Sequence, residues 1–141
     1  MGIDKNQVLK EVKPLFADIN RYSETAEADL FLQCYAETQD FIAISGDGII
    51  RNYTEFKKIC KEYYGSLSKQ KITTTHEIYH VLDDNTVVLS WSGHIEAFFK
   101  NGDFMKMENY AVTFLFNKKA GQWKVIHTHE STLPPEILKS K

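Results

Sequence analysis

The spacing of four histidines is the first feature of this sequence that bears on chemistry. His127 and His129 alternate in an apolar segment, so as strand residues they would share one face, with Cα atoms about 6.6 Å apart. Such a pair could bind a metal ion with Glu108 as a third ligand, but no recognised metal-ligand spacing surrounds it. His76 and His80 would lie about 13 Å apart and cannot share an ion. We therefore predict no metal and interpret these histidines as hydrogen-bonding residues.

The elements that position these residues are predicted to be strands. From residue 71 onward the hydrophobic period changes from helical to alternating, which favours antiparallel strands. The predicted strands are residues 71–82, 87–99, 104–117 and 122–131. The turns between them are Asp84-Asn85, Asn101-Gly102 (a type I′ signal) and Ala120-Gly121.

The first half of the chain has helical periodicity. Apolar residues predict an amphipathic helix over residues 4–22, which Pro14 kinks or divides, and a shorter helix over residues 26–36. Residues 41–45 read as a short strand closed by a glycine-rich turn. Asn52 with Glu55 has the spacing of a capping box and opens a helix that ends near residue 65.

Two-residue turns fix an expected strand register and therefore two faces of the sheet. The expected neighbours are Val87 with Leu82, Phe104 with Phe99, Trp91 with Ile78 and Val112, Tyr110 with Gly93, His127 with Val112, and His129 with Tyr110. The apolar face then also carries polar groups: His76, His80, Glu108, Tyr110, His127, His129 and Ser131. The opposite face receives Met107, Thr128 and Glu130. A single β-bulge would exchange the two faces beyond it.

Two segments resemble a known superfamily. The run from Asp40 to Gly48 (DFIAISGDG) is similar to the first strand and turn of nuclear-transport-factor-2-like proteins, in particular SnoaL-like and ketosteroid-isomerase-like members. The run from Trp123 to Ser131 (WKVIHTHES) resembles their last strand, and also the closing strand of the calcium/calmodulin-dependent kinase association domain. The resemblance covers about residues 5–133. It implies an α+β, cystatin-like cone with element order α-α-β-α-β-β-β-β, in which a curled antiparallel sheet wraps N-terminal helices around an apolar cavity.

The resemblance also implies candidate site residues. Asp40 corresponds best to the carboxylate base of the isomerases, with His129 as the other candidate base, and Tyr35, Tyr110 or His129 would donate to a developing enolate. No strand aspartate is expected on the inner face as a second donor, and Glu108 is the nearest substitute. The remaining expected ligand contacts are His76, Trp91 and His127.

Two functions stay open at this point. The domain binds a small apolar organic ligand, with isomerase- or dehydratase-type proton transfer as its chemistry, or it is a non-catalytic dimerisation or ligand-sensing module. No cofactor is expected. The resemblance implies a homodimer through the outer sheet face, where Met105, Met107 and small side chains are expected.

Composition limits the remaining classes. The chain has 141 residues and a formal charge of -2, with scattered lysines, so we expect one domain over residues 1–141 and no nucleic-acid partner. Cys34 and Cys60 lack metal or disulfide spacing and are expected to be buried free thiols. No apolar run has the length of a signal core or a membrane span, which predicts a cytoplasmic protein without a membrane partner.

Overall fold

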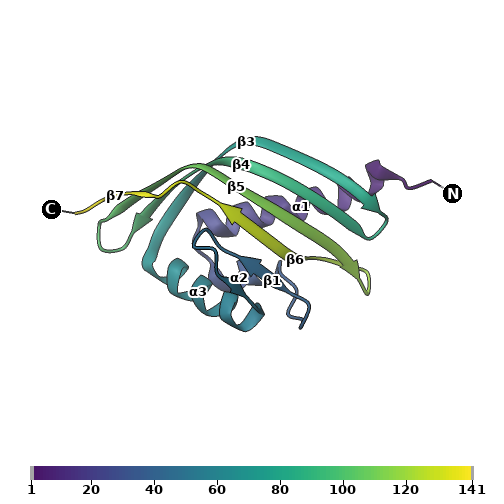
Figure 1. Cartoon of the computed structure of the whole chain (residues 1–141), viewed down its shortest axis with the longest axis horizontal. Helices are drawn as coiled ribbons and strands as arrows, with labels where there is room; N and C mark the ends of the chain where they lie inside the picture. Colours follow the sequence, from purple (N-terminus) through teal and green to yellow (C-terminus); the bar gives the residue numbers. More distant parts are fainter. Residues whose placement is uncertain (1, 141) are drawn as a thin grey trace.

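A curled sheet arches over three helices in the computed structural model, which describes residues 2–140 (Figure 1). The helices are α1 (Lys5–Glu24), α2 (Ala28–Leu32) and α3 (Tyr53–Ser66). The strands are β1 (Ile42–Ile44), β2 (Ile50–Arg51), β3 (Leu67–Asp83), β4 (Thr86–Phe99), β5 (Phe104–Lys119), β6 (Gln122–Ser131) and β7 (Glu136–Leu138). The strand order is β2-β1-β6-β5-β4-β3, and β7 pairs with β5. Among the residues described, no helix combines the length and apolarity needed to cross a membrane.

The predicted α+β fold is confirmed, with two differences in the sheet. It is mixed rather than purely antiparallel, because β1 runs parallel to β6, with Ile42 beside His127 and Ile44 beside His129. The two short strands β2 and β7 extend the predicted element order, since neither segment is long enough to show alternation in the sequence.

Local sequence explains where the long helices begin. The Asp4 carboxylate caps α1 by accepting from the Gln7 N–H at 3.1 Å, and α1 continues through Pro14 without a restart. The predicted capping box opens α3: the Asn52 side chain accepts from the Glu55 N–H at 2.9 Å, and the Glu55 carboxylate accepts from the Asn52 N–H at 3.2 Å.

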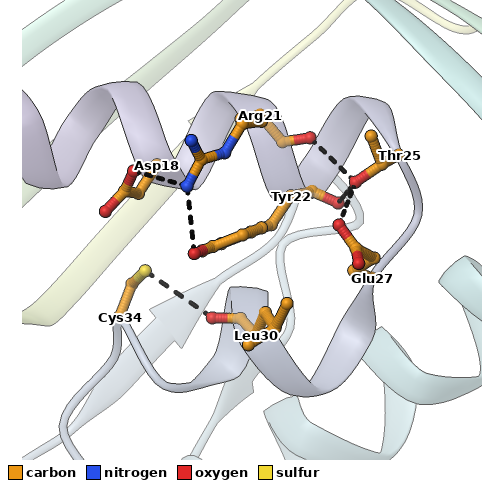
Figure 2. A network of polar contacts seen from close by, with 7 residues as sticks. All are labelled: Asp18, Arg21, Tyr22, Thr25, Glu27, Leu30 and Cys34. Atoms are coloured by element: carbon orange, nitrogen blue, oxygen red, sulfur yellow. Dashed lines mark hydrogen bonds and ion pairs between the residues drawn. The ribbon is translucent and has the colours of Figure 1, made fainter.

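Polar contacts surround the end of α1 and the tight turn that leads into α2 (Figure 2). The Arg21 guanidinium donates to the Asp18 carboxylate at 3.0 Å and to the Tyr22 hydroxyl at 3.1 Å. The Thr25 hydroxyl lies 3.0 Å from the Arg21 carbonyl oxygen and 2.6 Å from the Glu27 carboxylate. This turn holds the last turn of α1 over the inner face of the sheet, where its side chains reach the cavity described below.

The core lies between the inner face of the sheet and the helices. Its most deeply buried large side chains are Phe16, Phe41, Phe116, Leu67, Leu89, Val12, Val87 and Val125. The far end of α1 is tied to the sheet by Glu11, which accepts from the Lys118 ammonium at 2.9 Å and from the Trp123 indole N–H at 2.8 Å. Both cysteines are buried free thiols, as predicted.

Register shifts in the long strands exchange the faces that strict alternation predicts. Trp91 pairs with Val112 and Gly93 with Tyr110, as expected. Each β-bulge adds an unpaired residue and reverses the alternation beyond it. In β3 the extra residues are Ser68, Thr75 and Leu82. In β5 one extra residue lies between the pairs Gly93–Tyr110 and Ile95–Met107, and in β6 the extra residue is Ile126, between the pairs Leu115–His127 and Phe116–Val125.

Five of the seven expected pairs are wrong. The observed pairs are Val87 with Val81, Phe104 with Phe98, Trp91 with Glu77, Ile78 with Ser90, His127 with Leu115, and His129 with Thr113. The consequence for β6 is the largest. Val125 remains inside opposite Phe116, Ile126 is the extra residue, and Thr128 and Glu130 turn inward in place of His127 and His129.

Candidate functional site

A cavity of about 620 Å³ lies between the inner face of the sheet and the helices. This volume is in the range of pockets that hold small organic molecules. Aromatic rings from all three helices, from the segment after α2 and from β4 and β5 line it: Phe16, Phe31, Tyr35, Phe56, Tyr63, Tyr64, Trp91, Tyr110 and Phe114. The loop of residues 45–47 and the segment of residues 132–135 also contribute to the wall.

Glu130 brings a carboxyl group into this apolar wall. Because of the bulge at Ile126, Glu130 lies on the same face of β6 as the buried Thr128 and lines the cavity. The phenol of Tyr110 and the backbone N–H of Gly46 approach the carboxyl as hydrogen-bond donors. Burial nevertheless raises the pKa of Glu130, because removal from water penalises the ionised form more than these two donors favour it.

A second carboxyl, that of Asp47, lies at the edge of the cavity and is already paired. Its two oxygens accept from the Arg51 guanidinium at 2.9 and 3.3 Å, and one of them also accepts from the Ile49 N–H at 2.9 Å. The hydrogen bond from Arg51 is the main reason why the pKa of Asp47 is lowered. The ion pair fixes the loop that presents the Gly46 N–H to Glu130.

A buried polar network forms another part of the wall, at the junction of α1, α3 and β3. The Gln70 amide donates to the carbonyl oxygen of Ser23 at 3.1 Å and to its hydroxyl at 2.9 Å. The Tyr63 hydroxyl donates to the Gln70 amide oxygen at 2.5 Å, and the hydroxyls of Ser23 and Tyr64 lie 3.0 Å apart. These groups satisfy one another, so they shape the cavity rather than leave a strong unpaired donor in it.

Tyr110, which approaches Glu130, packs against Trp91 in the cavity wall. Their rings meet edge to face with centroids 6.1 Å apart. The Trp91 indole N–H donates to the Thr74 hydroxyl at 2.9 Å, which fixes the ring across β3 and β4. Burial raises the pKa of Tyr110 well above its ordinary value, so this phenol stays protonated and acts as a hydrogen-bond donor.

The structure brings together only some of the predicted site residues. Tyr35, Trp91 and Tyr110 line the cavity, although their contact with a ligand stays a prediction. Asp40 and Glu108 are exposed and lie outside the cavity lining.

The predicted inward orientation of the histidines is wrong. His76 is exposed on the outer face, where its Nδ1 lies 3.0 Å from the Ser92 hydroxyl, and His80 is exposed opposite Val88. His127 and His129 lie outside the cavity lining, opposite Leu115 and Thr113. Within residues 2–140, no group of three His, Cys, Asp or Glu side chains is arranged to hold a metal ion.

Glu130, Gln70 and Ser23 are among the polar lining residues that the sequence reasoning missed. Glu130 was expected on the outer face because nothing in residues 122–131 marks the extra residue at Ile126. Met107 was misplaced in the same way, and it lines the cavity beyond the irregularity at Asn109, whose φ is 53°. Asparagine tolerates this left-handed backbone better than most residues, so Asn109 was the one available signal of a bulge.

Comparison with known proteins places this fold in a family. The family model of the SnoaL-like domain matches residues 12–135. A comparison with curated proteins found no match.

Solved structures with the same fold cover nearly the whole chain. One is a proposed dehydratase of the NTF2-like family from Streptomyces avermitilis, with a TM-score of 0.79, 10% identity, and coverage of 91% of this chain and 97% of that one. Another is a proposed scytalone dehydratase from Novosphingobium aromaticivorans, with a TM-score of 0.78, 10% identity, and coverage of 98% and 93%. A proposed calcium/calmodulin-dependent protein kinase II association domain from Xanthomonas campestris has a TM-score of 0.75, 20% identity, and coverage of 95% and 94%. These TM-scores establish the shared fold, and the family match over most of the chain shows that the protein belongs to the SnoaL-like domain family.

Proposed function

We propose that the cavity binds a small, mostly apolar organic molecule and that Glu130 exchanges a proton with it. The observation that carries this proposal is the position of one carboxyl, with a raised pKa, in an aromatic cavity of about 620 Å³. A carboxyl whose pKa is raised by burial is a stronger base than an ordinary carboxylate, which suits it to take up a proton from a bound molecule and return it. Similar folds in proposed dehydratases agree with chemistry of this type.

In this proposal the neighbouring groups hold the acid–base residue and the molecule in place. The Tyr110 phenol and the Gly46 N–H orient the Glu130 carboxyl, and the aromatic wall excludes water from it. Glu130 takes the role for which Asp40 and His129 were considered, because neither of those residues lines the cavity.

Native mass spectrometry of the purified protein, before and after organic extraction, tests whether the cavity holds a molecule. The released molecule is then incubated in deuterium oxide with the extracted protein, and loss of its exchangeable C–H signal is followed by NMR. We expect exchange to slow about 100-fold or more in Glu130→Gln, since general-base catalysis is typically worth that much. Glu62→Gln, an exposed carboxyl on α3 outside the cavity lining, is the matched control.

If exchange proceeds at the same rate in Glu130→Gln, the proton-transfer role of Glu130 is contradicted, and ligand binding is the only part of the proposed function that remains. A protein that carries no molecule would favour the alternative of a dimerisation or ligand-sensing module. The observation that favours this alternative is that the chain shares its fold with a proposed kinase association domain.

We also propose a homodimer through the outer face of the sheet. The face carries a row of neighbouring residues across four strands, Ile78, Ser90, Thr113 and His129, in which Ile78 is 50% exposed. Small side chains in the middle of this row would let a second sheet approach closely, and an exposed isoleucine is favourable to bury. Met107 does not contribute as expected, because it lines the cavity on the inner side.

A further inference from the structure

The charges of the cavity are all of one sign. Its lining includes the carboxyl groups of Asp47 and Glu130, and no lysine, arginine or histidine belongs to the lining in the described part of the chain. The rest of the wall is aromatic, aliphatic or neutral and polar. An anionic ligand would therefore meet negative charge without any compensating cation.

Only one of the two carboxyls lacks a positive partner. Asp47 is neutralised by the Arg51 guanidinium at 2.9 Å. Glu130 forms no ion pair within residues 2–140, and its two donors, the Tyr110 phenol and the Gly46 N–H, are neutral dipoles. A carboxylate in this position is stabilised most by a cation that comes with the ligand, because a charge removed from water needs a counter-charge.

The aromatic wall suits the same kind of ligand. Ammonium groups are attracted to the faces of tryptophan and tyrosine rings. Tyr110 approaches the Glu130 carboxyl, and Trp91, which also lines the cavity, packs against Tyr110. The apolar side chains further from Glu130 would hold the hydrocarbon part of the molecule.

We infer that the cavity takes a hydrophobic amine in its ammonium form, with the nitrogen paired to the Glu130 carboxylate and the hydrocarbon skeleton against the aromatic wall. This inference rests on the proposed function only in that the cavity binds a small molecule. It adds the charge of that molecule and makes Glu130 the residue that selects it.

The test compares three probes with one skeleton and different head groups. 2-Naphthylmethylamine, 2-naphthalenemethanol and 2-naphthoate are titrated into the full chain at pH 7.5 by calorimetry, and the same three head groups are then tested on phenyl and adamantyl skeletons. We expect the amine to bind at least about tenfold more tightly than the alcohol, and the carboxylate to bind with the lowest affinity. This order should hold for each hydrocarbon skeleton that fits into the cavity. Glu130→Gln should reduce the preference for the amine to about threefold or less, while Glu62→Gln keeps it.

Each other outcome overturns a stated part of the account. An alcohol that binds as tightly as the amine would overturn the charge selection and leave the proposed binding cavity in place. A preference for the amine that survives in Glu130→Gln would overturn Glu130 as the counter-charge. If no probe on any skeleton binds, both the inference and the proposed small-molecule cavity fail.

Discussion

The rings of Trp91 and Tyr110 meet edge to face with centroids 6.1 Å apart, from neighbouring strands of the sheet, and Tyr110 in turn approaches the Glu130 carboxyl. Three adjacent strands, β4, β5 and β6, thus each contribute one side chain to the same part of the cavity wall. The relationship depends on strand register, because a shift of one residue would turn any of the three side chains outward.

The raised pKa of Glu130 predicts how stability depends on pH. Because the folded state holds this proton more tightly than the unfolded state, its contribution is complete below the ordinary glutamate pKa of about 4.3 and is lost as pH rises through the folded value. The groups that face it are Tyr35, Cys60, Tyr63, Tyr64 and Tyr110, all of which burial keeps protonated, and the paired Asp47 and Arg51.

Urea unfolding at several pH values measures this loss. We expect the free energy of unfolding of wild type to fall across that window relative to that of Glu130→Gln. Parallel pH profiles of the two proteins would show that the Glu130 carboxyl is not perturbed.

Glu11 predicts the opposite pH dependence. Hydrogen bonds from Lys118, Trp123 and Gln7 lower the pKa of Glu11 to about 2. The stabilisation is therefore present above about pH 4.3 and is lost as pH falls toward 2. Glu11→Gln should lower the melting temperature at pH 7, and the difference from wild type should close by about pH 2. Melting curves that differ equally at both pH values would mean that the ionised form of Glu11 is not what stabilises α1 on the sheet.

Gly93 is predicted to be intolerant of any side chain. A Cβ at this position would lie 2.0 Å from the Thr73 carbonyl oxygen and 2.9 Å from the Trp91 ring. Gly93→Ala should therefore destabilise the fold by about 3 kcal/mol, since overpacking a tight core typically costs 1–3 kcal/mol and backbone cannot yield easily. Gly65→Ala is the control: nothing lies within 4 Å of a Cβ there, and alanine favours the helix by about 0.5–1 kcal/mol. Equal stability of the two variants in urea unfolding would contradict the close contact between β3 and β4.

If the protein dimerises as proposed, its mass in solution depends on concentration, and a substitution of one exposed residue at the interface should prevent dimerisation. Ile78→Glu should convert the dimer to a monomer in analytical ultracentrifugation at micromolar concentration. The substitution would place a carboxylate on the outer face of each protomer, where the dimer would bury it against the partner sheet. Leu133→Glu, which alters an exposed apolar residue away from the outer face, should leave the dimer intact. A monomeric mass for wild type would exclude the dimer.

The sequence predicted those elements whose signals are local. The helical period, the capping box at Asn52 and Glu55 and the turn glycine Gly102, whose φ is 93°, all agree with the structure. Trp91 beside Val112 and Gly93 beside Tyr110 were also predicted correctly, but only because two departures from the predicted register cancel. At the turn Phe104 pairs with Phe98 rather than with Phe99, and the register shift between Gly93 and Ile95 restores the expected pairs beyond it.

The site was predicted poorly because it depends on backbone irregularities and on pairing between distant segments. An extra residue at Ile126 has no compositional signature, yet it decides that Glu130 rather than His129 faces the cavity. The parallel pairing of β1 with β6 is equally invisible to local patterns, although it holds the loop that brings Gly46 to Glu130.

The central claim is that Glu130 is a proton-exchanging carboxyl inside a ligand cavity. Carbon-13 NMR of protein labelled at the glutamate side chains, with Glu130→Gln used to assign the signal, measures its titration directly. The account predicts a carboxyl that titrates above the ordinary value of about 4.3 and whose signal shifts when 2-naphthylmethylamine is added. A Glu130 signal that titrates near 4.3 and does not respond to the amine would contradict both the perturbed carboxyl and its place in the ligand site.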